Sequence, residues 1–128
     1  MKNSINFLII IFIIFFVKIL HANNLFESSF KKIEFQTNNI EDTKNYHINE
    51  LKKFNLNQIL KNILTNENYK KLRNKIDIQF ADHLIKNIII ENEKILNDRY
   101  SANIKINFDK DLIIQLLRNS AGRLGKKK

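Results

Sequence analysis

The chain has 128 residues, which is room for one small domain and too few for two. It contains no cysteine, so disulfide bonds and cysteine-based chemistry are excluded and a hydrophobic core must hold the fold. The formal net charge is +9, but most of this excess lies at the two ends of the chain.

The basic charge does not by itself predict a nucleic-acid binder. Six of the 22 basic residues belong to the N-terminal leader or the last eight residues, which leaves 16 basic against 13 acidic residues between positions 23 and 120. These charges alternate in sign, whereas nucleic acid requires a basic stripe or patch. Binding of nucleic acid or an anionic surface through the basic tail, residues 121–128, is therefore an alternative and not the first prediction.

An apolar segment near the N-terminus predicts where the protein works. Lys2 precedes eleven consecutive apolar residues, Phe7 to Val17, and the small residue Ala22 suits the last position before a signal-peptidase cut. A secretory signal peptide has these three regions in the same order: a positively charged region, an apolar region, and small residues before the cut. We predict a signal peptide over residues 1–22, cleavage between Ala22 and Asn23, and export to the periplasm or cell envelope.

Two alternatives for this segment remain. Ile5 to Leu20 has 16 residues, and as a helix it would span about 24 Å, short of the roughly 30 Å of a bilayer core. Lys18 could extend its ammonium group to the interface, so an uncleaved anchor in the inner membrane is the main alternative. A buried core helix is less favoured because every face of the segment is apolar.

The first half of the mature chain predicts a strand and three helices. Alternation indicates a strand over Phe30 to Gln36, and the polar run Thr37 to Thr43 indicates a loop ending in a helix cap, Asp42 or Thr43. Apolar residues at three- and four-residue spacing predict a long helix over Lys44 to Leu64. Two shorter helices are expected over Asn68 to Asn74 and Asp77 to Lys86.

The second half predicts a hairpin and a final helix. Ile88 to Ile95 reads as a strand, and Tyr100 to Phe108 alternates apolar and polar residues without a miss. The turn between them contains Asn97 and Asp98, which tolerate positive φ. Asp109 is expected to cap a helix from Lys110 to about Asn119, with Gly122 near its stop and a disordered basic tail over residues 121–128.

These elements predict an α+β domain over residues 23–120. The expected architecture is a small antiparallel three-stranded sheet packed on one face by three to four helices, preceded by the hydrophobic leader helix. The edges of so small a sheet could accept a strand from a partner.

The region from Gln58 to Leu117 resembles a family of bacterial exported or envelope-associated proteins that is filed as a domain of unknown function. The resemblance rests on the leucine-containing turn Ile59 to Thr65, the isoleucine-rich strand Ile88 to Glu93, the strand Tyr100 to Asp109 and the pair Leu116–Leu117. The turn after Thr65 lacks the glycine that the family would have there. The resemblance implies export and an α+β fold, and it implies no activity.

The histidines do not predict a metal site. His21 lies at the end of the leader, while His47 and His83 lie on separate helices without ligands at the spacing of an HExxH motif. Asp82 and His83 are adjacent, so on a helix they point about 100° apart. We predict no metal and no cofactor.

The remaining polar residues do not predict a catalytic centre. Glu91 and Glu93 are expected on one face of a strand, the face left in water, and Asp109 is assigned to helix capping. The serines lie in no nucleophile elbow, both glycines lie in the tail, and the aromatic residues are spaced as in a core. The sequence therefore predicts a non-enzymatic domain with an envelope protein as partner, attached to the membrane only through its leader.

Overall fold

The computed structural model of the chain describes residues 5–6, 9–10 and 25–125, with side chains described as far as residue 120. Most of the predicted leader, together with the cleavage site between Ala22 and Asn23, lies outside the described residues. The signal peptide and the membrane anchor therefore stay predictions. Within the described part, no helix combines the length and the apolar character that crossing a bilayer requires.

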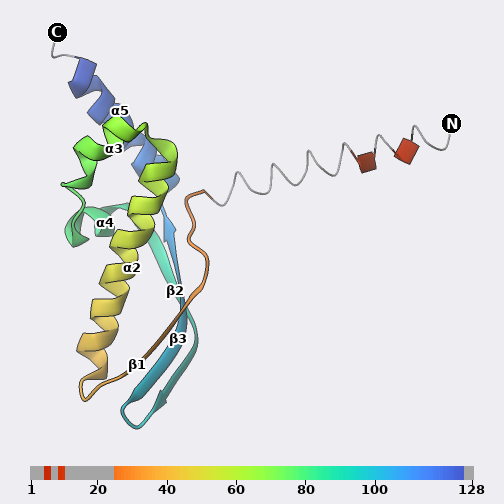
Figure 1. Ribbon diagram of the computed structural model, residues 1–128, viewed down its shortest axis with the longest axis vertical. Coiled ribbons are helices and arrows are strands. Elements are labelled where there is room, and N and C mark those ends of the chain that lie inside the picture. The colour runs from red at the N-terminus through yellow and green to blue at the C-terminus, as the bar shows by residue number, and fades with distance from the viewer. Residues whose placement is uncertain (1–4, 7–8, 11–24, 126–128) are drawn as a thin grey trace.

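The fold is α+β, with three strands and four helices between residues 25 and 125. The elements follow in the order β1 (Lys31–Gln36), α2 (Ile40–Ile63), α3 (Asn66–Arg73), α4 (Ile78–Leu84), β2 (Ile85–Leu96), β3 (Arg99–Phe108) and α5 (Lys110–Gly125). The β1–α2 turn and the β2–β3 turn lie at one end of the molecule, while α3 and α5 lie toward the other (Figure 1).

The three strands form an antiparallel sheet in the order β1-β3-β2. β1 and β2 are parallel to each other because both pair antiparallel with β3, which lies between them. Upstream of β1, the segment 26–28 continues this edge, since Ser28 donates to the carbonyl of Ile106 and Phe108 donates to that of Phe26. Both sides of β3 are thus hydrogen-bonded, while β1 and β2 each have one edge that no other described strand occupies.

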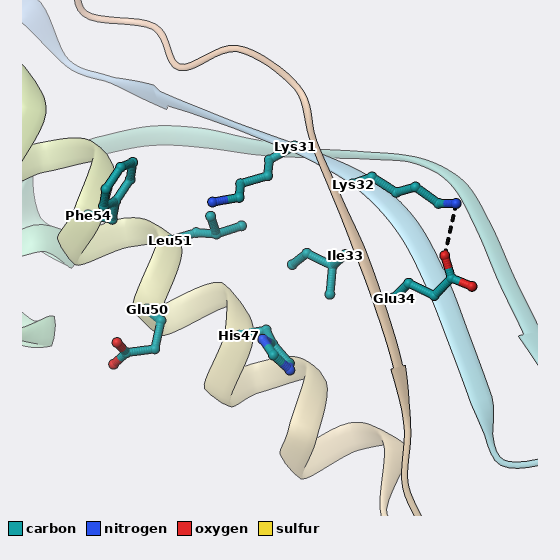
Figure 2. A pocket seen from close by; sticks show the side chains of 8 residues that line it. All are labelled: Lys31, Lys32, Ile33, Glu34, His47, Glu50, Leu51 and Phe54. Carbon is teal, nitrogen blue, oxygen red and sulfur yellow. Dashed lines mark ion pairs between the residues drawn. The ribbon is translucent and has the colours of Figure 1, made fainter.

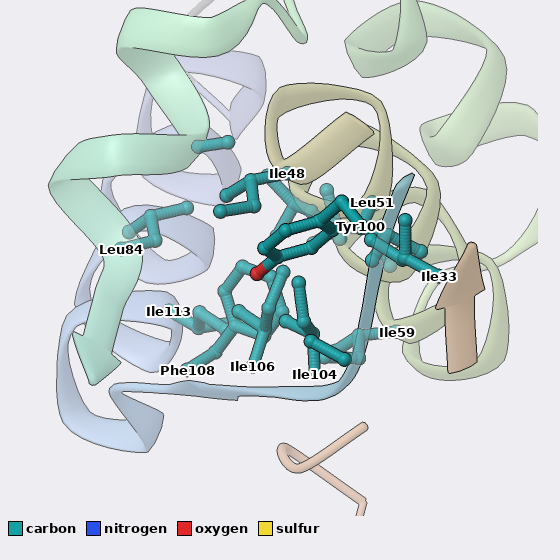
Figure 3. Packing of buried hydrophobic residues seen from close by; sticks show 14 residues of the cluster. Ile33, Ile48, Leu51, Ile59, Leu84, Tyr100, Ile104, Ile106, Phe108 and Ile113 are labelled. Carbon is teal, nitrogen blue, oxygen red and sulfur yellow. The ribbon is translucent and has the colours of Figure 1, made fainter. Parts of the chain in front are cut away.

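The core lies between one face of the sheet and the helices. Every second residue of β3 is buried there, as its alternation predicts: Tyr100, Ala102, Ile104, Ile106 and Phe108. α2 supplies the largest share of the opposing side chains, with Leu56 and Leu60 fully buried, and α4 and α5 add Leu84 and Ile113 (Figure 3). The predicted arrangement of a three-stranded antiparallel sheet with helices is confirmed.

The helix starts are set by capping side chains, and the predicted starts of α2 and α3 are wrong, since α3 begins at Asn66 and not at Asn68. α2 begins at Ile40, four residues before the predicted Lys44, because Asn39 rather than Asp42 or Thr43 is the cap and accepts from the amide of Asp42. Thr65 and Asp77 cap α3 and α4 in the same way.

The ends of α4 and α5 also differ from the prediction. α4 stops at Leu84, and the strand begins at Ile85, three residues before the predicted Ile88. Asp109 caps α5 as expected, accepting from the amides of Asp111 and Leu112. α5 continues past Gly122 to Gly125, so the predicted end at Asn119 is too early.

Two asparagines with positive φ shape the hairpin. Asn97 (φ 56°) lies in the tight turn, as predicted, and Asn92 (φ 54°) lies inside β2. At Asn92 the pairing shifts by one residue, because Glu91 pairs with Asn103 whereas Lys94 pairs with Ser101. This is a β-bulge, which the sequence pattern did not predict.

The packing predicts an uneven response of β3 to truncation. Ile106→Ala removes a fully buried side chain and should lower the free energy of unfolding by about 2–5 kcal/mol. Asn103→Ala, on the opposite face of the same strand, should change it by less than about 0.5 kcal/mol. Urea unfolding followed by circular dichroism measures both, and equal losses would contradict the burial pattern.

Candidate functional site

The exposed edge of β1 presents backbone groups that no described strand pairs. Thr37 donates to the carbonyl of Asp98, so the residue before β3 and the residue after β1 are hydrogen-bonded to each other. Hydrogen-bonded residues alternate with residues that are not bonded along an antiparallel pair, so Phe35, Ile33 and Lys31 are the residues of β1 that are bonded to β3. The N–H and C=O groups of Lys32 and Glu34, between them, therefore point away from β3. An extended peptide could form main-chain hydrogen bonds with this edge.

A groove runs between this edge and α2. It consists of two hollows of about 370 and 420 Å³, both lined by Phe54. Ile33 and Leu51 line the first hollow, while Ser28, Gln58 and Ile59 are among the residues that line the second. Figure 2 shows Ile33 reaching from β1 toward α2 and Leu51 reaching back from the helix. The groove thus has apolar side chains between a hydrogen-bonding edge and a helix.

Phe54 is the most exposed aromatic side chain in the groove, with 53% of its surface accessible. The spacing of the aromatic residues along the chain predicted that Phe54 packs in the core, and this prediction is wrong. Phe54 lies two positions before the fully buried Leu56, so the two side chains point about 160° apart on α2. That angular offset from the buried stripe is the sequence signal that could have identified it.

The charges around the groove are mostly neutralised, with one exception. Lys32 pairs with Glu34 on the far side of β1 at 2.9 Å, and Glu50 pairs with Lys53 at 2.7 Å. Lys31 instead extends toward α2, its ammonium nitrogen 5.2 Å from the centre of the Phe54 ring, and has no carboxylate partner among the described residues (Figure 2). The groove therefore carries one cation over an aromatic face.

A stack of rings fixes the end of the groove near the β1–α2 turn. Phe35 lies between His47 and Tyr100, with centroid distances of 5.1 and 5.0 Å. The buried Tyr100 hydroxyl donates to Glu93 at 2.8 Å, and Lys44 donates to the same carboxylate oxygen at 2.7 Å. These contacts join α2 to all three strands, so they hold the helix at its distance from β1.

The hydrogen-bonded groups have shifted acidities. The Lys44 ammonium group, and then the Tyr100 hydroxyl, lower the pKa of Glu93. The hydrogen bond to Glu93 raises the pKa of Lys44. Burial raises the pKa of Tyr100, and its bond to Glu93 adds to this. All three pKa shifts keep Tyr100 neutral and keep Lys44 and Glu93 charged at neutral pH. These groups are therefore suited to holding α2 against the sheet and not to transferring a proton.

The structure separates the two carboxylates that the sequence placed on one wet face. Glu91 pairs in register with Asn103, on the face away from the helices. The bulge at Asn92 turns Glu93 to the helix-covered face, where it meets Tyr100. The expectation that both lie on the same face is wrong, and they do not form an acid–base pair.

The histidines and serines lie apart. His47 stacks on Phe35, and His83 lies on α4 with its Nδ1 atom 2.7 Å from the carbonyl of Gln79. Asp82, beside it in sequence, pairs with Lys52 at 2.8 Å. The Ser28 hydroxyl accepts from the amide of Ile106. Among the described residues, no three His, Asp or Glu side chains gather in a way that could hold a metal ion.

Comparison with protein-family models, with curated proteins and with solved structures finds no significant match to this chain. The resemblance to an envelope-associated family therefore stays a prediction from sequence.

The pKa of Glu93 predicts a pH-dependent contribution to stability. Because its pKa is lower in the folded state, the contribution is complete above the unfolded pKa of about 4.3 and is lost as the pH falls through the folded pKa. Glu93→Gln should cost about 1 kcal/mol at pH 7, a modest value because the side chain is 40% exposed, and less at pH 3. Urea unfolding at both values of pH measures this.

Glu91→Gln is the matched control. Its carboxylate lies on the other face of β2 and has no ion pair among the described residues, so it should change stability little at either pH. Equal effects of the two substitutions would show that Glu93 has no special role.

Proposed function

We propose that this domain is a non-enzymatic protein-interaction module that binds an extended peptide segment in the groove between β1 and α2. The observation that carries the proposal is the combination of an unpaired strand edge with a partly apolar groove beside it, whose two hollows meet at the half-exposed Phe54. Main-chain bonds to an edge supply affinity, and a neighbouring pocket supplies specificity for side chains.

The lining of the groove defines the chemistry of the segment. One branched or aromatic side chain would pack against Phe54, Ile33 and Leu51. An acidic side chain near it would meet Lys31, the groove cation that has no carboxylate partner among the described residues. The second hollow is lined partly by Ser28, Asn55 and Gln58, which accommodate small polar residues. Its other lining is the apolar Leu25 and Ile59 and the carboxylate of Glu27, which pairs with Lys105. The partner is thus an extended segment that carries an apolar and an acidic side chain.

The setting of this module rests on the sequence alone. The leader supports export to the periplasm or cell envelope, where the partner would be an envelope protein, and an uncleaved leader would anchor the same domain in the inner membrane. Binding of nucleic acid or an anionic surface through the basic tail is the less favoured alternative, because residues 23–120 carry a nearly balanced charge and the leader favours export. A hydrolase is less favoured still, because the described histidines and serines do not converge.

A displayed library of random peptides, selected against the full-length chain, tests the proposal. We expect the selected peptides to share an apolar and an acidic residue. Phe54→Ala should weaken their binding by about tenfold or more, since exposed aromatic residues in a contact are typical hot spots. Calorimetry with the synthetic peptides measures the change.

Tyr46→Ala is the matched control for Phe54→Ala. Tyr46 is an exposed aromatic residue of the same helix, 63% accessible, and it does not line the groove, so its loss should change binding by less than about twofold. Hydrogen exchange adds a second criterion, since a bound segment should protect the amides of Lys32 and Glu34. Peptides that bind both variants equally and leave these amides unprotected would overturn the proposal.

A further inference from the structure

The opposite edge of the sheet, along β2, is a separate surface. β2 has 12 residues, and among the described strands it pairs with β3 alone. The hairpin turn places Leu96 opposite Arg99. Counting back from this pair, the residues of β2 that are hydrogen-bonded to β3 are Lys94, Glu91, Ile89 and Asn87. The backbone groups of Ile88 and Ile90 therefore point to the outer edge.

This edge has apolar side chains that the helices leave uncovered. Ile90 is 37% exposed and Ile95 is 61% exposed, although both lie in register with core residues of β3. A strand edge with exposed apolar side chains is a template for pairing with another strand, and monomeric proteins usually shorten, cover, kink or charge such an edge. The charges and register shifts of β2 lie toward its two ends, whereas residues 88–90 between them are all isoleucine. No described element covers this edge.

The regular part of β2 is complementary to itself. The register shifts lie after Ile85 and after Glu91, which leaves residues 87–91 as an uninterrupted stretch reading Asn-Ile-Ile-Ile-Glu. An antiparallel pairing of two copies about a two-fold axis at Ile89 places Ile88 opposite Ile90 and Asn87 opposite Glu91. In this pairing Ile88 and Ile90 are the bonded pair, as their outward-pointing backbone groups require, and every apolar residue faces an apolar one.

The charges of β2 fit the same pairing. The strand carries two lysines and two glutamates, so two copies do not repel each other through net charge. Lys86 precedes the regular stretch and Glu91 ends it, and the antiparallel arrangement brings each Lys86 toward the end of the other copy that carries Glu91. Opposite charges across a strand pair are stabilising, whereas like charges directly opposite are not.

We propose that the partner of the β2 edge is a second copy of this chain, paired antiparallel about Ile89 into a continuous six-stranded sheet. This inference is independent of the peptide groove, because β1 and β2 lie at opposite edges with β3 between them. The dimer would leave β1 of each copy at the outer edges of the joined sheet, so its two grooves would remain accessible.

Single-cysteine cross-linking tests the pairing, since the natural chain has no cysteine. In the full-length chain, Ile89→Cys places two thiols at the two-fold axis as a non-hydrogen-bonded pair, whose Cβ atoms lie about 4.5–5.5 Å apart, close enough for a disulfide after a small adjustment. We expect mild oxidation to convert most of this variant to a covalent dimer.

Ile95→Cys is the matched control on the same strand. In the proposed register its two thiols lie about 40 Å apart, so it should form little dimer. Adding Ile90→Lys to Ile89→Cys buries two unpaired charges in the interface and should suppress the cross-link several-fold. Ile90 is already partly exposed, so this change should leave the monomer folded, which circular dichroism checks.

Two results would overturn the proposal. Equal cross-linking of Ile89→Cys and Ile95→Cys would show that copies associate through another part of the chain, such as the leader. Failure of Ile89→Cys to cross-link, with a monomeric mass in sedimentation, would show that the edge stays unpaired by a second copy. In neither case would the peptide-binding result for Phe54→Ala change, so the two proposals fail separately.

Discussion

The structure depends on β3 being hydrogen-bonded on both sides while one of its faces is completely buried. Five alternate residues, from Tyr100 to Phe108, face the helices and leave no gap in the pattern. Because a shift of one residue would turn all of them to water, the register with both neighbours is tightly specified. β1, β2 and α2 pack directly against this strand, and the two strand edges to which we assign functions follow from that arrangement.

The groove is a consequence of this arrangement. α2 packs its buried stripe onto the core face of the sheet with Leu56, Ile59 and Leu60. β1 then lies beside the helix rather than beneath it, and only Ile33 of this strand is buried. The ring stack with His47 and the Lys44–Glu93 ion pair tie α2 to the sheet near the turn, so the space along β1 cannot close by a simple approach of the helix. A preformed groove of this kind lowers the entropic cost of binding a segment.

The sequence predicted the parts of the fold that repeat a pattern and missed those set by single contacts. The alternation in β3 and the helical stripe of α2 are visible because each is a sum of many burials. The start of α2 was misplaced because three polar residues could serve as its cap, and the choice of Asn39 depends on a hydrogen bond to Asp42. The bulge at Asn92 was missed because nothing local distinguishes one asparagine in a strand from its neighbours, and this single residue decides which way Glu93 points.

The two edges differ in what they can accept, and this difference gives each a separate role. β1 is short, and α2 lies beside it, so its edge admits only a slender segment that fits between strand and helix. β2 is twice as long and has no described element beside its edge, so it can pair with a strand that already belongs to a sheet. A free peptide would gain little there, because neither hollow of the groove lies along this edge, whereas a second copy brings its own Ile88 and Ile90 to cover the exposed ones. The same physical constraint, that strand edges must be paired or protected, thus leads to a ligand at β1 and to self-association at β2.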